Sequence, residues 1–183
     1  MSILDNFTHS KPSKDDLYEI HQLEQQCYSD EWDRKCRPLE YIQEMYKYFE
    51  DFFMITRENS TGRIVGCIYG KLWCNIQNID TVEDSSTWEY RSKHGHIFTT
   101  DSFCVHPDYR NTGLGESMAR YLHNDWILGD LGGPNVHKVT HLISNITSEL
   151  DTMLIRADFV KICKIGVYLN KTYYRWQKLR NTE

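Results

Sequence analysis

The segment Arg110-Asn-Thr-Gly113-Leu-Gly115 carries the clearest chemistry in the sequence, because it follows a predicted strand and opens a predicted helix. The first turn of a helix leaves backbone N–H groups without intrahelical partners, and these donors, together with the helix dipole, favour a bound anion. Glycine lets the main chain bend sharply and approach phosphate oxygens closely. The Arg110 guanidinium can add charge-assisted hydrogen bonds. The segment therefore predicts a cradle for a pyrophosphate group.

The spacing of these glycines excludes two other phosphate-binding motifs. A dinucleotide-binding site needs G-x-G-x-x-G within a βαβ unit, and a P-loop needs G-K-[ST]. Glu116 follows Gly115 here, so neither motif is present. A glycine-rich turn that only joins a strand to a helix is the remaining alternative, and the context of the segment argues against it.

Two N-terminal helices are predicted by apolar residues at helical spacing. The first begins after Pro12, with Ser13 and Asp16 in a capping-box arrangement, and the second begins at Pro38. Their apolar faces are Leu17, Ile20, Leu23 and Cys27 in the first helix, and Pro38, Ile42, Met45 and Phe49 in the second.

Strands are predicted where β-branched and aromatic residues alternate with turn signals. They cover residues 52–56, 64–73, 96–105, 139–146, 160–167 and 173–176, with a helix at 115–128 and a short helix from Ser148. The polar segment 74–93 is predicted to be a long loop or insertion, and loops of this length inside compact domains are often functional. The order β-α-α-β-β-β-α-β-α-β-β indicates one α/β domain over residues 1–183 with a mixed sheet.

Composition excludes several classes of protein. The net charge is −5 with no basic stripe, which argues against a nucleic-acid partner. No run of 18 apolar residues occurs, so no membrane span is expected, and the N-terminus lacks a secretory pattern, so a cytoplasmic location is expected. The six cysteines form no C-x-x-C pair and no zinc-like spacing with histidines, so reduced thiols and no metal site are predicted.

The segment Val105-His-Pro107-Asp-Tyr109-Arg110-Asn-Thr-Gly113-Leu-Gly115 resembles the signature of the GNAT superfamily of acyl-CoA-dependent N-acyltransferases. That signature is a strand ending in V-x-P, followed by [RQ]-x-x-G-x-[GA] at the start of a helix. Ala157-Asp-Phe159 is similar to the G-F of the family in a degenerate form. The resemblance implies a single GNAT-like domain, with a central, mostly antiparallel, splayed sheet flanked by helices.

The resemblance also implies an activity: transfer of an acetyl group from acetyl-CoA, as co-substrate, to a primary amine by direct attack in a ternary complex. The amine belongs to a small molecule or to a protein or peptide. An alkylamine is mostly protonated at pH 7, so a base must remove its proton, and the developing oxyanion needs hydrogen-bond donors.

Site residues are carried over from the family onto the matching positions. Backbone groups of Phe103, Cys104 and Val105 would hold the thioester and pantetheine, and Asn145 would contact the pantetheine arm. Asp101, four residues before Val105, would order a water or the substrate amine; a solvated or capped strand aspartate is the alternative. The pyrophosphate would contact Arg110, Asn111, Thr112, Gly113, Leu114, Gly115 and Glu116.

One departure from the family keeps other functions open. Leu154 occupies the position of the tyrosine that many members use to protonate the leaving thiolate. A regulatory protein that binds acyl-CoA without turnover is therefore the second interpretation. An enzyme acting on charged tRNA is a third, and it would require a basic face that the sequence does not show. An exposed edge of the splayed sheet could pair two chains into a homodimer.

Overall fold

The computed structural model describes residues 3–28, 37–73, 94–127, 138–144, 152, 154–156, 158–168 and 171–179. Four predicted features lie outside these residues: Asn145, Ser148, Ala157 and the loop at 74–93. The chain divides into two compact units, one made of 1–70 and 101–122 and the other of 71–100 and 123–183. Together they contain the mixed α/β structure expected from the sequence.

The first unit contains strands in the order β1-β2-β3-β4. These strands are β1 (Phe7–Ser10), β2 (Phe53–Glu58), β3 (Ile64–Trp73) and β4 (Ile97–Val105), the last two being shared with the second unit. β1 pairs antiparallel with β2, and β2 pairs antiparallel with β3. The element order predicted from the sequence starts with a strand but gives it no residue range. The structure shows that this first strand is β1.

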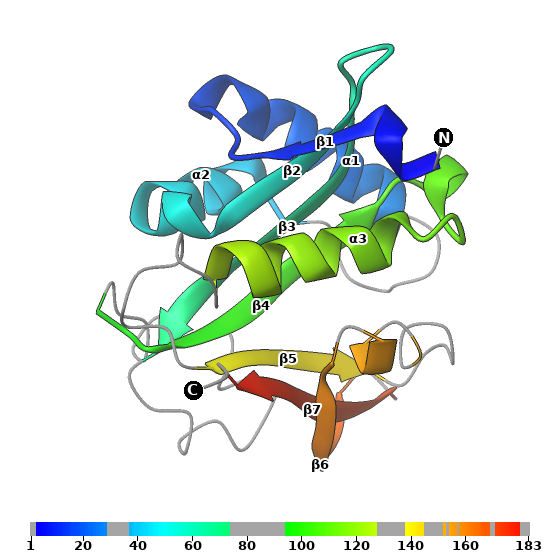
Figure 1. Ribbon diagram of the computed structural model, residues 1–183. Coiled ribbons are helices and arrows are strands. Elements are labelled where there is room, and N and C mark those ends of the chain that lie inside the picture. Colours follow the sequence, from blue (N-terminus) through cyan, green and yellow to red (C-terminus); the bar gives the residue numbers. More distant parts are fainter. Residues whose placement is uncertain are drawn as a thin grey trace. The chain divides into compact units, whose positions relative to one another are not determined.

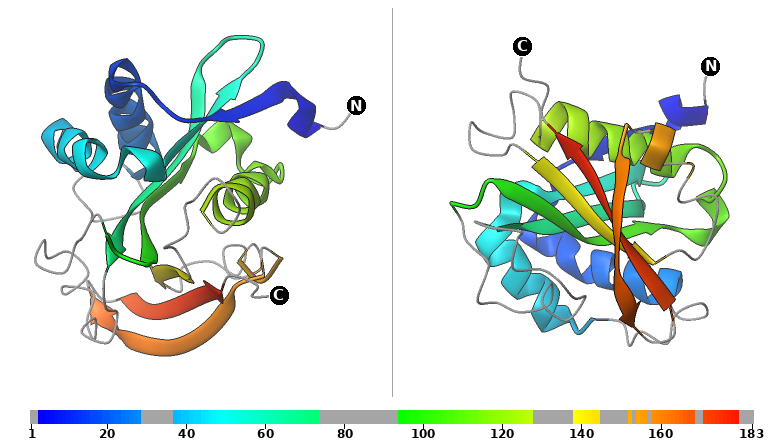
Figure 2. Two further views of the ribbon diagram at one scale, coloured as in Figure 1. Left: turned by 60° about the vertical axis from the view of Figure 1, so that its left-hand side comes forward. Right: turned by 90° about the horizontal axis from the view of Figure 1, so that it is seen from below.

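Helices cover both faces of this part of the sheet. α1 (Leu17–Tyr28) and α2 (Leu39–Phe49) lie on one face, and α3 (Leu114–Arg120) lies on the other (Figures 1 and 2). A π-helical segment, Tyr121–Ile127, continues α3. The prediction of one uniform helix over residues 115–128 is therefore wrong, because the α-helix changes to a π-helix at Tyr121. Apolar residues four apart fit either kind of turn, and Leu114, Met118 and Leu122 are all buried.

The predicted apolar faces of α1 and α2 are confirmed with one correction. Leu17, Ile20, Leu23 and Cys27 are buried in α1, and Ile42, Met45 and Phe49 are buried in α2. Pro38 is exposed, because it precedes the helix with an extended backbone, and Tyr46 completes the buried face instead. The predicted cap is present, with Ser13 N donating to Asp16 Oδ2 at 2.7 Å.

The second unit contains strands in the order β4-β5-β7-β6. β5 (Lys138–Ser144) pairs antiparallel with β7 (Lys171–Leu179), which pairs antiparallel with β6 (Val160–Tyr168) as a curved hairpin (Figure 2). Among the described strand pairs only β4–β5 is parallel, and its ladder covers Ile97 to Thr99. The sheet is therefore mixed and mostly antiparallel, as predicted. No helix in the described part of the chain is long and apolar enough to cross a membrane.

Candidate active site

The predicted pyrophosphate turn leaves β4 through a short 3-10 helix, Pro107–Tyr109, and reaches α3 through two left-handed residues. Asn111 has φ 61° and Gly113 has φ 86°. Asparagine tolerates this region and glycine adopts it without steric cost. Thr112 Oγ1 donates to Tyr109 O at 2.7 Å and braces the turn. The signature therefore forms the sharp strand-to-helix turn that its glycine predicted.

Gly113 is the N-cap residue directly before α3, and Ser117 N donates to its carbonyl oxygen at 3.0 Å. The amides of Leu114, Gly115 and Glu116 precede Ser117, at the helix start where N–H groups have no intrahelical acceptor. A Cβ added to Gly113 would meet no described atom within 4 Å. The helix start thus offers main-chain donors, and the space at the Cβ position of Gly113 is open, which is compatible with a pyrophosphate cradle.

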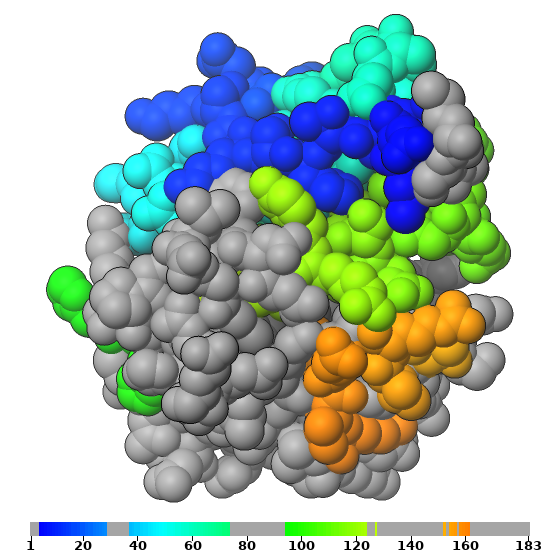
Figure 3. Space-filling model, in the orientation of Figure 1, coloured from blue at the N-terminus to red at the C-terminus, as the bar shows by residue number. Residues whose placement is uncertain are grey.

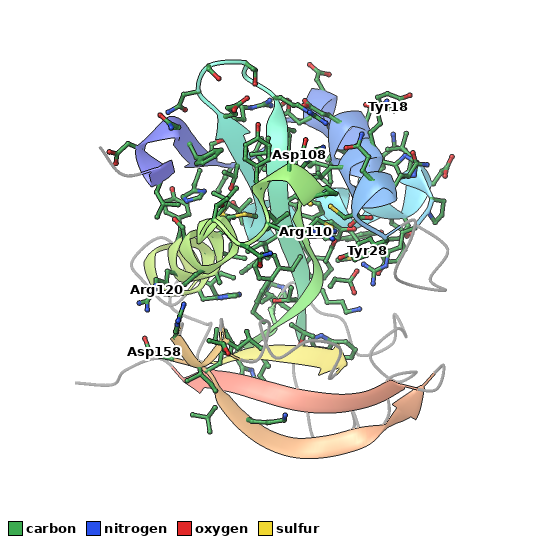
Figure 4. The ribbon with its side chains drawn as sticks, turned by 90° about the vertical axis from the view of Figure 1, so that its right-hand side faces the viewer. Tyr18, Tyr28, Asp108, Arg110, Arg120 and Asp158 are labelled. Atoms are coloured by element: carbon green, nitrogen blue, oxygen red, sulfur yellow. The ribbon has the colours of Figure 1, made fainter. Side chains whose placement is uncertain are left out.

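Arg110 ties this turn to α1. Its Nη2 donates to Cys27 O at 3.2 Å, and its Nε lies 3.4 Å from Val105 O, at the end of β4 (Figure 4). The Cys27 carbonyl belongs to the last turn of α1, where carbonyl groups lack intrahelical donors. Arg110 thus fixes the loop through main-chain contacts that the sequence did not predict, while its phosphate contact remains a prediction.

Polar and apolar contacts fix α3 against the sheet. His9 Nε2 lies 3.1 Å from Ser117 Oγ, and His9 Nδ1 lies 2.8 Å from Thr56 Oγ1. β1 and α3 accordingly lie side by side on the molecular surface (Figure 3). Beneath the helix, a Cβ on Gly66 would come within 2.5 Å of Met118 Sδ, so the absence of a side chain permits close packing. The helix that carries the turn is therefore firmly positioned.

Side chains of β4 alternate between the two faces of the sheet. Ser102 and Cys104 are buried, whereas Asp101, Phe103 and Val105 are half-buried. Tyr28 Oη donates to Phe103 O at 3.2 Å, which brings the end of α1 to the strand predicted to hold the thioester. The structure therefore places the predicted thioester strand next to the last residue of α1.

Asp101 is held by two donors from the region of α2. Its Oδ2 lies 2.7 Å from Arg37 Nη1 and accepts a hydrogen bond from Tyr41 Oη at 2.8 Å. The Asp101 side chain is 7% exposed, so it is not a solvated strand aspartate. Burial alone would lower the pKa of Arg37. The Asp101 carboxylate raises this pKa, so the guanidinium stays charged. The arrangement fixes the direction of the carboxylate.

Glu24 is a second carboxyl group, which the sequence reasoning missed. It is buried on α1, and its Oε1 accepts hydrogen bonds from Tyr69 Oη at 2.7 Å and from Ser102 Oγ. Burial raises the pKa of Glu24 to about 7, against the lowering effects of the Arg37 charge and these two hydrogen bonds. A carboxyl group with a shifted pKa beside a candidate site is typical of residues that transfer protons.

Two buried thiols, those of Cys67 and Cys104, lie beside this carboxyl, and a third buried thiol belongs to Cys27 on the same helix. None of these three cysteines is part of a disulfide. The Glu24 carboxylate and the thiols of Cys67 and Cys104 lie within 4.8 Å of one another. Sequence spacing gave no sign of this group, because its members come from a helix and two strands.

Asp158 and Phe159 of the degenerate G-F motif lie in the second unit, as does Leu154. Leu154 is fully buried, and Phe159 N donates to its carbonyl oxygen at 2.9 Å. Asp158 has φ 64°, the left-handed conformation that glycine would adopt easily. Because Leu154 has no titratable group, it cannot protonate a leaving thiolate.

Several solved structures share this fold at low sequence identity. The loading GNATL domain of CurA from Lyngbya majuscula is 15% identical, with a TM-score of 0.74, over 94% of this chain and 97% of that one. YncA of Salmonella typhimurium, solved with its cofactor acetyl-CoA, is 14% identical, with a TM-score of 0.70, over 97% and 96%. The GphF GNAT-like decarboxylase, in complex with isobutyryl-CoA, is 11% identical, with a TM-score of 0.72, over 96% and 99%.

No curated protein matches the sequence significantly. The sequence model of the Acetyltransferase (GNAT) family matches residues 17–130, which are more than half of the chain. The matched region contains α1, α2 and the turn around Gly113. The chain therefore belongs to the Acetyltransferase (GNAT) family.

Proposed function

We propose that the chain is an N-acetyltransferase that moves an acetyl group from acetyl-CoA to a primary amine. The observation that carries this proposal is the left-handed turn at Gly113, which opens α3 beside unfilled space. Such a helix start binds pyrophosphate through backbone amides, without needing a basic patch. The acetyl-CoA bound to yncA, a protein of the same fold, supports the choice of co-substrate.

Asp101 orders the amine or a water molecule in this proposal. Arg37 and Tyr41 hold its carboxylate at fixed positions, so it presents a directed negative charge to an ammonium group. Backbone groups of Phe103, Cys104 and Val105 hold the thioester and pantetheine, and they supply donors for the oxyanion. Asn145 remains a proposed contact of the pantetheine arm.

The leaving thiolate is protonated by solvent or by a residue other than Leu154. A thiol has an ordinary pKa of about 8.5, so its thiolate is a tolerable leaving group near neutral pH. Loss of the usual tyrosine therefore does not prevent turnover.

The acceptor is an amine of a small molecule or of a protein. The proposal includes one functional domain spanning residues 1–183, a cytoplasmic location and pairing of two chains through a sheet edge. None of these features is needed for the chemistry of the turn, so each can fail separately.

The direct test measures CoA release from acetyl-CoA in the presence of a panel of alkylamines and peptides. Mass spectrometry of the product must identify an acetyl amide, which separates transfer from simple thioester hydrolysis. Tight acetyl-CoA binding with no amide formed from any acceptor would favour the alternative, a regulatory protein that binds acyl-CoA without turnover.

A further inference from the structure

We propose that Glu24 receives the proton lost by the acceptor ammonium, through the hydroxyl groups of Tyr28 and Ser102. The proposal rests on the acetyl transfer proposed above and names the group on which that proton lands. Glu24 acts through other side chains, so it is a positioning residue for the proton and does not touch the substrate.

The inner half of this path is a direct contact between two buried groups. Ser102 Oγ donates to Glu24 Oε1, and Tyr69 Oη donates to the same oxygen at 2.7 Å. Ser102 is 3% exposed and Glu24 is 1% exposed. A carboxylate with two hydroxyl donors is well placed to accept a proton along either bond.

The outer half of the path leads to the predicted acyl position. Tyr28 Oη lies 3.5 Å from Ser102 Oγ and donates to Phe103 O at 3.2 Å. Tyr28 is half-buried at the end of α1 (Figure 4), whereas Ser102 and Glu24 are buried behind it. The three groups therefore form a chain from the thioester strand to the interior.

The proton and electron balance is simple. The ammonium gives a proton to Tyr28 Oη, and the phenol hydrogen turns from Phe103 O to Ser102 Oγ and passes to it. The serine proton then passes to the Glu24 carboxylate. The neutral amine then forms the C–N bond, the C–S bond breaks, and CoA leaves as a thiolate. The second amine proton goes to that thiolate. One net proton remains on Glu24 and returns to solvent after turnover.

The surroundings of Glu24 suit this role. The groups that face it are Tyr28 from α1, Arg37 from the segment before α2, Tyr69 and Cys67 from β3, and Ser102 and Cys104 from β4. Burial raises the pKa of Glu24 to about 7, despite Arg37. A proton acceptor is most effective when its pKa lies near the working pH. Asp101, by contrast, is held in an ion pair with Arg37 and orients the ammonium.

The experiment compares Glu24→Gln with the wild type at saturating acetyl-CoA and saturating alkylamine. Glutamine keeps an oxygen that can accept from Ser102 and Tyr69 but cannot take up a proton. We expect kcat at pH 7 to fall by roughly 10²-fold or more, with the KM for acetyl-CoA unchanged. The fall of kcat below pH about 7 in the wild type should also disappear in the variant.

A weakly basic amine that is already neutral at pH 7 separates proton transfer from structural damage. The Glu24→Gln defect should shrink to within a few-fold with this acceptor, because no ammonium proton has to be removed. A merely structural role would reduce the rate equally for both amines. Tyr28→Phe, which removes one hydroxyl at a half-buried position, should show the same dependence on amine basicity. The matched control is Glu19→Gln, on the same helix, whose carboxylate accepts from Ile64 N at 2.7 Å and should leave both rates unchanged.

Melting temperature and acetyl-CoA affinity are measured for every variant, and Tyr28→Phe decides the matter if Glu24→Gln does not fold. If the wild type acetylates amines and the folded variants show the same rates and pH profiles as the wild type, the role of Glu24 is overturned while the proposed function stands. A wild type that binds acetyl-CoA but acetylates no amine would overturn the proposed function and this inference with it.

Discussion

Arg37 Nη1 and Asp101 Oδ2 form an ion pair of 2.7 Å between the residue that precedes Pro38 and strand β4. The same guanidinium nitrogen donates to Asp101 O at 2.9 Å, so it contacts both the side chain and the backbone. Tyr41 Oη completes the contact from the first turn of α2. This cluster joins the segment before α2 to the strand predicted to hold the thioester, and it restricts Asp101 to one direction.

Asp101→Asn should reduce both stability and activity. The variant leaves Arg37 without its opposite charge in a half-buried position, which should lower the free energy of unfolding by about 1–3 kcal/mol. We expect kcat/KM to fall roughly tenfold or more across roughly pH 6 to 9. Denaturant unfolding and steady-state kinetics measure the two effects.

The control for this variant is Asp51→Asn, which removes the exposed ion pair with Lys11. An exposed pair of this kind contributes only about 0–1 kcal/mol, so stability and rate should hardly change. Full wild-type kcat/KM in a folded Asp101→Asn protein would contradict the proposed role of Asp101.

Gly113→Ala should weaken acetyl-CoA binding through the backbone. A Cβ at φ 86° is strained by about 1–2 kcal/mol, and it would also occupy the open space beside the amides. We expect the dissociation constant for acetyl-CoA to rise on the order of tenfold. Isothermal titration calorimetry measures this change.

Gly62→Ala supplies the matched control, because Gly62 has φ 73° and also has open space around its Cα. It lies in the hairpin between β2 and β3, so it should lose similar stability without losing affinity for acetyl-CoA. Equal affinity losses in the two variants would mean that strain alone, and not the position of Gly113, explains the effect.

The strands and helices near the signature were predictable because their apolar residues follow simple periods. Residues 64–73 form β3 with the predicted bounds, and Gly113 adopts the left-handed turn that its motif requires. β1 escaped assignment because its four residues, Phe7–Ser10, contain a single large apolar side chain. A short, half-exposed edge strand has no period to detect.

The polar cluster of the site was not predictable from local patterns. Glu24 follows Ile20 by four residues and precedes Cys27 by three, so it lies on the apolar stripe of α1. An acidic residue on that stripe was the available signal. Its partners, Tyr69 and Ser102, lie 45 and 78 residues further along the chain, so only the folded sheet reveals the contact.

Glu24 should make stability depend on pH. Its pKa rises from 4.5 to about 7 on folding, so the native state binds this proton more tightly than the unfolded state. Stability is therefore lost as the pH rises from about 4.5 to about 7, by about 3 kcal/mol relative to Glu24→Gln. Parallel pH-dependence of wild-type and Glu24→Gln unfolding free energies would show that Glu24 titrates normally.

Arg110→Ala should loosen the turn and weaken cofactor binding together. The variant removes the hydrogen bond to Cys27 O and a cation at the entrance of the loop, so we expect about 1 kcal/mol of lost stability and weaker acetyl-CoA binding. Arg120→Ala is the control, because Arg120 is exposed and pairs with Glu116 within α3. If Arg110→Ala binds acetyl-CoA as tightly as Arg120→Ala does, Arg110 has no part in the cradle.

In the proposed function, main-chain amides around Gly113 bind the pyrophosphate of an acyl carrier. Calorimetric titration of the wild-type chain with acetyl-CoA and with S-acetylpantetheine, which lacks the pyrophosphate, tests it most directly. We predict saturable binding of acetyl-CoA and at least about 100-fold weaker binding of the truncated thioester. No measurable affinity for acetyl-CoA, or equal affinity for the two thioesters, would show that the turn around Gly113 does not bind a pyrophosphate.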